Sequence, residues 1–151
     1  MTGFDEKYNE LLAELGKGRT MVLSSCEEGR VSSRMMSVVC MDGAFYFQTD
    51  RNFRKYRQLT ANPYGALCVD NLEIEGVCRE LCRPMEHPRF CQVFRDCFPG
   101  SFRAYSALED ERLFVLEPIL ARRWLYIDGA PYIESFDIEN REYRLMPYEG
   151  V

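Results

Sequence analysis

Four basic residues crowd the start of a predicted helix, and their types and spacing suit anion binding. They are Arg51, Arg54, Lys55 and Arg57. We expect the N-cap of this helix to be Asp50 or Asn52. A helix N-terminus already presents unpaired N–H groups and a partial positive charge, so cations there are locally unfavourable. A bound anion would compensate, so the stretch predicts a phosphate-bearing ligand; the alternative is a solvated basic helix face without one.

The basic cluster is an exception on an acidic chain of 151 residues with a formal net charge of −5. This balance argues against nucleic acid as a partner and favours a small anionic ligand. The hydrophobic content of 46% predicts one globular domain over residues 1–151. Charged residues interrupt every apolar run, and the N-terminus lacks the pattern of a secretory signal. We therefore expect no membrane partner and a cytoplasmic location.

Seven cysteines without an export signal predict reduced thiols. Cys26, Cys40 and Cys68 lie in apolar, strand-like runs and are interpreted as small core residues. A denser group includes the single histidine and comprises Cys78, Cys82, His87, Cys91 and Cys97. Its spacings match no standard zinc module, so we predict no metal site and keep a metal cluster as an alternative. His87 is expected at a turn or helix start rather than as a catalyst.

Hydrophobic periodicity predicts a few helices among many strands. Helices are expected over residues 4–16 and 86–97. The basic helix is expected to end before Pro63, because the residue that precedes a proline is disfavoured in a helix. Residues 99–110 should form a loop with a short helix. The predicted strands cover residues 20–26, 30–40, 44–49, 64–70, 72–82, 112–118, 119–129, 130–137 and 141–146.

Glycines punctuate these strands. Gly29, Gly43 and Gly129 sit where tight hairpin turns are expected, and the last two follow an aspartate. Gly76 interrupts a strand and predicts a bulge or sharp bend there. Frequent turns, antiparallel strands and few helices predict a mainly β fold, a β-barrel with attached helices.

The order of elements and four motifs resemble the FMN-binding split β-barrel of the pyridoxamine 5′-phosphate oxidase-like superfamily. The resemblance covers nearly the whole chain. The motifs are MVLSSCEEGRVSSRMMSVV, DGAFYFQTDRNFRKYRQLTANP, NLEIEGVCRE and RRWLYIDGAPYIESFD. This resemblance implies an antiparallel, Greek-key-like split barrel that binds FMN at the interface of a homodimer.

The resemblance also implies which residues hold the cofactor. Arg54 and Lys55 match the residues that grip the FMN phosphate, and Arg34 matches a strand arginine that reaches the same cofactor. The other matched positions line the flavin or reach it, and they are Met35, Met36, Gln48, Thr49, Asn71 and Trp124. Of these, Asn71 is expected to reach the flavin from the partner subunit. For Trp124, a core or interface aromatic is an equal alternative.

Two departures from the family pattern bear on the site and the substrate. Phe53 stands where the family usually has a serine, so Arg51 or a backbone N–H must replace one hydroxyl donor. The Phe53 ring could instead form a hydrophobic staple or partly block the site. The C-terminal Trp-x-Gly and Arg-x-His pattern of true pyridoxamine phosphate oxidases is absent, so we do not predict oxidation of vitamin B6.

The leading expectation is an FMN-dependent oxidoreductase that passes hydride or electrons to or from a small-molecule substrate, with the cofactor supplying the redox chemistry. The catalytic residues are not identified; Tyr105 and Tyr126 are candidate proton donors. Alternatives are a flavin-binding module without catalysis, and a relative that binds haem or a deazaflavin, with His87 as the haem ligand to test. An aromatic content of 13% also favours a homodimer, because one subunit would leave apolar surface uncovered.

Overall fold

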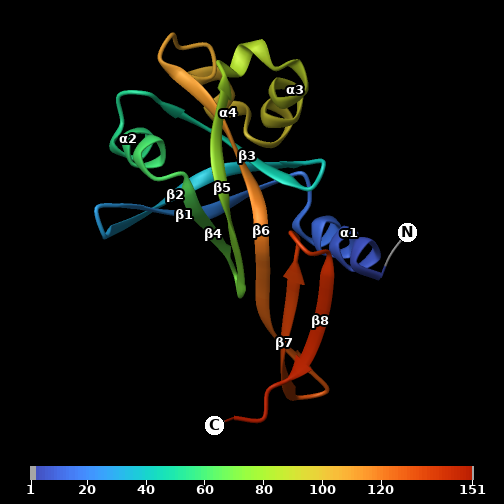
Figure 1. Cartoon of the computed structure of the whole chain (residues 1–151). Helices are drawn as coiled ribbons and strands as arrows, with labels where there is room; N and C mark the ends of the chain where they lie inside the picture. The colour runs from blue at the N-terminus through green and yellow to red at the C-terminus, as the bar shows by residue number, and fades with distance from the viewer. Residues whose placement is uncertain (1–2, 151) are drawn as a thin grey trace.

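The computed structural model describes residues 3–150, which form a barrel of antiparallel strands with helices around it (Figure 1). In chain order the elements are α1 (Gly3–Leu15), β1 (Gly18–Glu27), β2 (Arg30–Met41), β3 (Ala44–Asp50), α2 (Arg54–Ala61), β4 (Tyr64–Val69), β5 (Leu72–Cys82), the 3₁₀ turn η1 (Pro84–Glu86), α3 (Pro88–Cys97), α4 (Pro99–Tyr105), β6 (Glu111–Ile127), β7 (Ala130–Asp137) and β8 (Glu142–Pro147).

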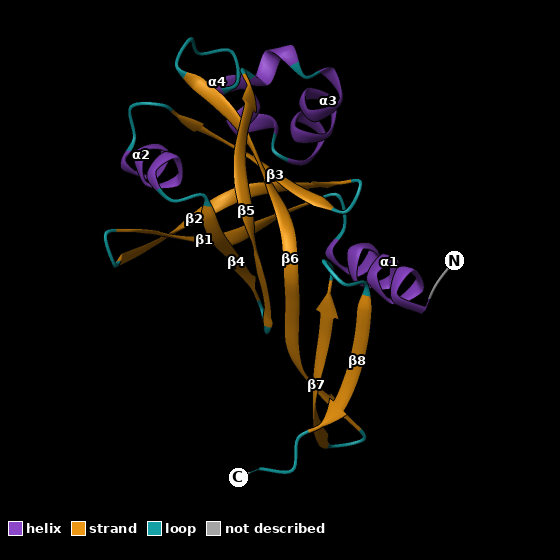
Figure 2. Cartoon of the chain, viewed as in Figure 1, coloured by secondary structure: helices purple, strands orange, loops and turns teal. Residues whose placement is uncertain are grey.

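The barrel closes because β3 and β6, at the two ends of the strand order β3-β2-β1-β4-β5-β6, pair with each other. Three hairpin-connected strands are followed by β4, which returns beside β1, and this arrangement is a Greek key. Strands β7 and β8 extend the sheet from β6 beyond the barrel as a protruding hairpin (Figure 2). The predicted mainly β, antiparallel, Greek-key-like split barrel is confirmed.

Two-residue turns join β1 to β2, β2 to β3 and β6 to β7, as the glycine pattern predicted. Asp42 and Gly43 have φ angles of 52° and 79°, and Asp128 and Gly129 have φ angles of 51° and 81°. Paired positive φ values are those of the type I′ turn, whose twist matches that of the flanking strands. These turns set the register of β2 with β3 and of β6 with β7.

The long strand β6 replaces the two strands predicted over residues 112–118 and 119–129, so that prediction was wrong. Pro118 cannot donate a ladder hydrogen bond, and it lies opposite Gly76 where the register between β5 and β6 shifts. The irregularity absorbs the proline without ending the strand. The bulge or bend predicted at Gly76 is confirmed.

The core has two parts. The larger fills the barrel and extends under α1, whose buried face is Phe4, Tyr8, Leu11 and Leu15. The smaller lies where α3 and α4 cover one end of the barrel, and consists of Val39, Met41, Phe90, Phe94 and Leu113 (Figure 2). Within residues 3–150, no helix is both long and apolar enough to cross a bilayer.

Replacing Gly76 by alanine should destabilise the barrel. A Cβ there would lie 2.4 Å from the carbonyl oxygen of Glu117 and 2.5 Å from the Leu116 side chain. Overpacking of this kind costs about 1–3 kcal/mol, so urea unfolding of Gly76→Ala should show a lower free energy of unfolding. Gly100→Ala in α4 is the control, because its Cβ meets nothing within 4 Å. Equal stability of the two variants would contradict the close packing at the bulge.

Candidate cofactor site

A tight turn between β3 and α2 sets where the basic helix begins. The Asp50 carboxylate accepts hydrogen bonds from the backbone N–H of Asn52 at 2.8 Å and from its side-chain amide at 2.9 Å. The Phe53 N–H donates to the Asp50 carbonyl at 3.1 Å. Because both polar side chains are engaged in the turn, α2 begins at Arg54 with Phe53 as its N-cap. The predicted N-cap, Asp50 or Asn52, was therefore wrong.

Phe53 provides no side-chain hydrogen bond to the helix. The N–H groups of the first turn of α2 have no partner within the helix, so they are free to bind an anion. The Phe53 ring is 56% exposed, which is not the packing of a hydrophobic staple. Instead the Lys55 ammonium lies over this ring, 5.1 Å from its centroid.

The four basic residues of this region fall into two pairs. Arg51 forms an ion pair with Asp110, with an N–O distance of 2.8 Å, and Arg57 lies 3.9 Å from a Glu27 oxygen. Arg51 is thus held by its own carboxylate. In the described part of the chain, Arg54 and Lys55 have no ion-pair partner within 4 Å.

Arg34 reaches the same region from β2 and is held by neutral groups. Its guanidinium donates to the Ser25 hydroxyl at 2.9 Å, the Ser32 hydroxyl at 2.7 Å and the Gln58 side-chain oxygen at 3.0 Å. A fourth bond goes to the Leu23 carbonyl at 3.1 Å. These contacts fix the position of the charge without neutralising it.

The three cations repel one another. Burial and the charge of Arg54 lower the pKa of Arg34. Burial and the charge of Arg34 lower the pKa of Lys55, partly offset by Glu111. A ligand with two negative charges would relieve this repulsion and accept charge-assisted hydrogen bonds.

A cavity of about 340 Å³ lies beside Lys55. Its walls come from β2, β3, α2, α3, α4 and the start of β6. The predicted site residues that line it are Met35, Met36, Gln48, Thr49 and Lys55. Tyr105 of α4, a candidate proton donor, lines it as well. The volume is within the range of small-ligand pockets, and the walls combine apolar side chains with a few polar groups.

Glu111 in the same cavity was missed by the sequence analysis. It is 6% exposed and pairs with Asp50 across the β3–β6 register. Burial raises the pKa of Glu111 to about 7; the charge of Asp50 adds to this rise, while Lys55 and a hydrogen bond from Gln48 oppose it. In the sequence it ends the acidic run Glu109-Asp110-Glu111, which is typical of surface. Only the pairing of β6 with β3 places its side chain inside.

Asn71 and Trp124 lie elsewhere in the chain. The Asn71 amide, in the turn between β4 and β5, donates to the backbone carbonyl of Trp124. Both line a separate depression of about 350 Å³. Trp124 follows Glu111 by thirteen positions (124 − 111) along β6, which is roughly 40 Å of strand. A single chain therefore does not bring these two residues to the cavity beside Lys55.

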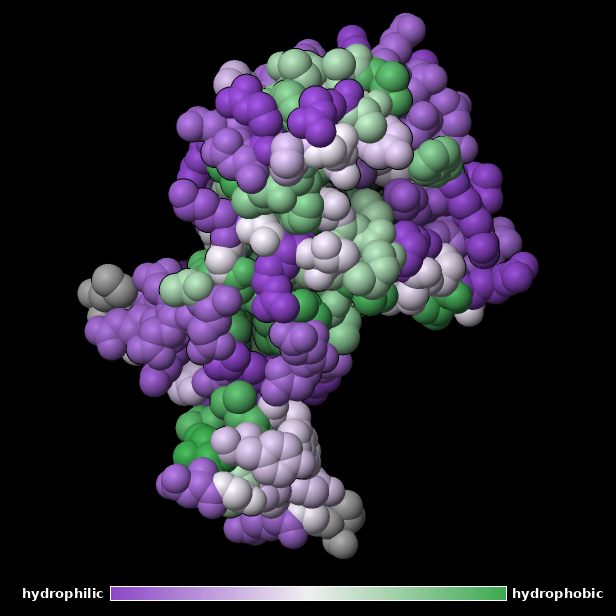
Figure 3. Space-filling model, turned by 180° about the vertical axis from the view of Figure 1, so that it is seen from behind, coloured by the Kyte–Doolittle hydropathy of each residue, from purple (hydrophilic) through white to green (hydrophobic). Residues whose placement is uncertain are grey.

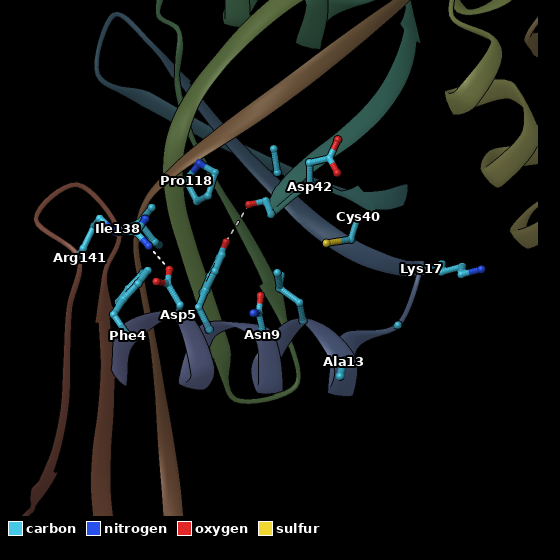
Figure 4. A pocket seen from close by; sticks show the side chains of 15 residues that line it. Phe4, Asp5, Asn9, Ala13, Lys17, Cys40, Asp42, Pro118, Ile138 and Arg141 are labelled. Carbon is cyan, nitrogen blue, oxygen red and sulfur yellow. Dashed lines mark hydrogen bonds and ion pairs between the residues drawn. The ribbon is translucent and has the colours of Figure 1, made fainter. Parts of the chain in front are cut away.

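A larger depression, of about 760 Å³, is an open groove between α1 and the β2–β3 turn (Figure 4). The Tyr8 hydroxyl donates to the Gly43 carbonyl across it at 2.8 Å, and Arg141 pairs with Asp5 at its edge. Burial raises the pKa of the Cys40 thiol to about 11, so it is protonated at neutral pH and is no nucleophile. None of the nine predicted site residues lines this groove, so we place the candidate site in the smaller cavity.

The cysteines and His87 do not converge. Cys78 lies in the barrel core, and the Cys91 thiol donates to the Pro84 carbonyl at 3.0 Å. The His87 Nδ1 accepts from the Phe90 N–H at 3.0 Å and caps α3, so the predicted helix start is confirmed. Across residues 3–150, no three His, Cys, Asp or Glu side chains are arranged to hold a metal ion.

The interpretation of Cys68 as a core residue was wrong. Its neighbours Leu67 and Val69 are buried, and because side chains alternate along a strand, Cys68 of β4 points outward and is exposed. Cys26 and Cys40 are partly buried.

Residues 4–125 match the family described as pyridoxamine 5′-phosphate oxidase, and the protein belongs to this family. It is similar to the pyridoxine/pyridoxamine 5′-phosphate oxidase of Burkholderia multivorans, with 32% identity over 122 residues. That alignment covers 79% of this chain and 49% of the relative, so the chain spans about half the length of that enzyme.

Solved structures share the fold at low sequence identity. A heme binding protein from Mycobacterium smegmatis superposes with a TM-score of 0.68 at 16% identity, covering 93% of this chain and 60% of the other. A pyridoxamine 5′-phosphate oxidase-related, FMN binding protein from Nostoc punctiforme PCC 73102 has a TM-score of 0.61 at 13% identity, covering 98% and 96%. The family match agrees with the expected pyridoxamine 5′-phosphate oxidase-like family and its oxidoreductase-like character.

Glu111 should make stability fall as pH rises. Its folded pKa of about 7 lies above the ordinary value of 4.5, so between these two pH values the folded state binds more protons than the unfolded state. The free energy of unfolding should therefore decrease across this window, by up to about 3 kcal/mol. Urea titrations at pH 5 and pH 8 should show that Glu111→Gln removes this decrease.

Glu109→Gln is the matched control, because this neighbouring glutamate is exposed. The control should keep the pH dependence of the wild type. An unchanged pH dependence in Glu111→Gln would show that the buried carboxyl does not titrate in this range.

Proposed function

We propose that the protein binds FMN and is an FMN-dependent oxidoreductase that acts on a small-molecule substrate. One observation carries the proposal: the cations Arg34, Arg54 and Lys55 gather without carboxylate ion pairs beside a cavity lined by Met35 and Met36. The membership of the family supports it.

The residues present fit the two ends of the cofactor. The phosphate would lie against Arg54, Lys55 and the open N-terminus of α2, where each charge-assisted hydrogen bond contributes about 1.5–3 kcal/mol. The ring would lie against Met35 and Met36, because thioethers pack well on aromatic faces. Bound FMN would supply the hydride or electron transfer. The protein would bind the cofactor, orient it and exclude water from one side of the ring.

A second copy of the chain would complete the site. Trp124, with Asn71 beside it, lies far along β6 from Glu111, which lines the cavity with Lys55, but a two-fold related copy could present both residues to the same ligand. The end of the molecule that carries Trp124 is also rich in exposed apolar side chains, namely Tyr126, Ile127, Leu145, Met146 and Tyr148. Such side chains gather on the narrow lobe that ends the molecule in Figure 3. A homodimer would bury this lobe.

A haem-binding function is the second candidate, favoured by the likeness of the fold to the Mycobacterium smegmatis heme binding protein. Against it, His87 uses Nδ1 to cap α3. Protein purified without added cofactor separates the candidates: an FMN-like or deazaflavin-like spectrum supports a flavin site, and a Soret band that is lost in His87→Ala supports haem.

Reversing one charge should remove FMN binding. Lys55→Glu places a carboxylate where the phosphate would bind, so we expect the Kd for FMN, measured by quenching of flavin fluorescence, to rise by at least about 100-fold. Arg57→Glu is the control, because it makes the same charge change two positions along α2, where the side chain faces Glu27. Equal losses in both variants would indicate a general charge effect instead of a phosphate site.

Turnover separates an enzyme from a flavin-binding module without catalysis. We expect the FMN-loaded protein to oxidise reduced nicotinamide in the presence of a quinone or nitroaromatic acceptor. Tight FMN binding without turnover with any donor would identify the module instead.

The lobe around Met146 should hold the dimer together. Met146 is 57% exposed, so Met146→Arg should place a charge in the proposed interface and shift sedimentation at micromolar concentration towards the monomer. Met85→Arg is the control, because Met85 is similarly exposed, at 49%, but lies in η1 at the other end of β5. A wild type that sediments as a monomer would contradict the proposed dimer.

A further inference from the structure

We infer that the Glu111 carboxyl, which lines the same cavity as Lys55, takes up one proton when a ligand phosphate binds to Lys55. The inference rests on the proposed function, since it concerns the same cavity and a phosphate-bearing ligand. It assigns a binding role to a residue that lies outside the basic motif.

The Glu111 carboxyl lies beside a buried polar pair, Ser106 and Gln48. The Ser106 hydroxyl donates to the Gln48 side-chain oxygen at 2.8 Å. With its oxygen engaged, Gln48 can offer its amide N–H groups to Glu111, and this interaction lowers the pKa of Glu111. Ser106, Gln48 and Glu111 are all buried, at 1%, 8% and 6% exposure. The carboxyl therefore has a defined place in the cavity wall.

Lys55 is the single cation among the residues that line this cavity. Its charge acts on Glu111, and the charge of Asp50, which faces Glu111 from β3, acts in the opposite direction. From α4 the cavity receives the neutral hydroxyls of Ser101 and Tyr105. No other basic side chain of the lining can compensate the Glu111 charge.

Arg112, the next residue on β6, does not take over this role. Its guanidinium donates to the backbone carbonyls of Glu109 and Glu111 at 2.7 and 2.8 Å and lies 4.0 Å from a Glu80 oxygen. Arg34 faces Lys55 from β2 and is held by neutral groups, so it adds to the positive charge that an incoming phosphate meets.

A ligand phosphate and the Glu111 carboxylate would therefore both be stabilised by one ammonium group, although Glu111 and Lys55 form no ion pair within 4 Å. When the phosphate binds, Lys55 is neutralised by the ligand and two negative charges enter the cavity beside Glu111. The carboxylate then takes one proton from solvent, and no covalent bond forms or breaks. Because binding consumes a proton, affinity must fall as pH rises above the range in which free Glu111 titrates.

The pH dependence of FMN affinity tests the inference. Between pH 7 and 8.5 the FMN phosphate is already a dianion, since its second pKa is about 6, so its own ionisation does not contribute. For the wild type we expect the Kd to rise about tenfold over this range. Glu111→Gln keeps the size of the side chain but cannot ionise, so its Kd should stay constant and be lower than that of the wild type at pH 8.5.

Riboflavin, which lacks the phosphate, serves as the matched ligand, and Glu109→Gln as the matched protein variant. Riboflavin affinity should not change with pH, and Glu109→Gln should behave as the wild type does. An FMN Kd that does not change with pH in the wild type would overturn this inference but leave the proposed function standing. An equal pH dependence of the Kd in Glu111→Gln and in the wild type would do the same. A wild type that binds no FMN at any pH would overturn the proposed function and this inference with it.

A measurement on the ligand-free protein tests the pairing directly. The carboxyl ¹³C resonance of Glu111, assigned by its loss in Glu111→Gln, should titrate in the neutral range in the wild type. In Lys55→Met, which removes the ammonium group and keeps an unbranched side chain, the midpoint should move to higher pH. A midpoint near that of an ordinary glutamate, or one unmoved in Lys55→Met, would show that the two groups do not interact.

Discussion

The pairing of β3 with β6 is the constraint on which the candidate site depends. It closes the barrel between strands that are more than sixty residues apart at Asp50 and Glu111 (111 − 50 = 61), and it brings the end of β3 beside the start of β6. The turn into α2 follows directly from this end of β3, so the first turn of the helix lies against the same wall. Backbone pairing thus places a carboxyl, an amide and an ammonium group around one cavity.

The basic cluster beside this cavity carries positive charge that the protein's own carboxylates do not neutralise. Neutral partners hold Arg34 in place, while Arg51 and Arg57, on either side of Arg54 and Lys55, have carboxylates of their own. Removing ion pairs from the middle of a basic cluster costs stability in the empty protein, and a bound anion offsets that cost. The same reasoning explains why the larger groove beside α1, with its Arg141–Asp5 pair, is the weaker candidate.

Local patterns predicted most of the elements because each has a local physical cause. The buried face of α1 follows its helical periodicity, and the Asp42–Gly43 turn follows the backbone freedom of glycine. The errors arose where a local signal met a long-range contact. Pro118 signals the end of a strand, but a bulge opposite Gly76 lets β6 continue. Asp50 signals an N-cap, but its carboxylate is engaged in the preceding turn.

The sequence by itself predicted an anionic ligand and candidate residues to hold it, because a basic helix start in an acidic chain is visible without any fold and the barrel motifs occur in their family order. Only the tertiary structure decided which of these residues share a wall. It places Asn71 and Trp124 away from Lys55, because the length of β6 keeps the two ends of this strand apart. It adds Glu111 to the wall of the cavity, because the pairing of β3 with β6 joins residues that are distant in the chain. Charge and turn signals are local, whereas proximity is a property of the closed sheet.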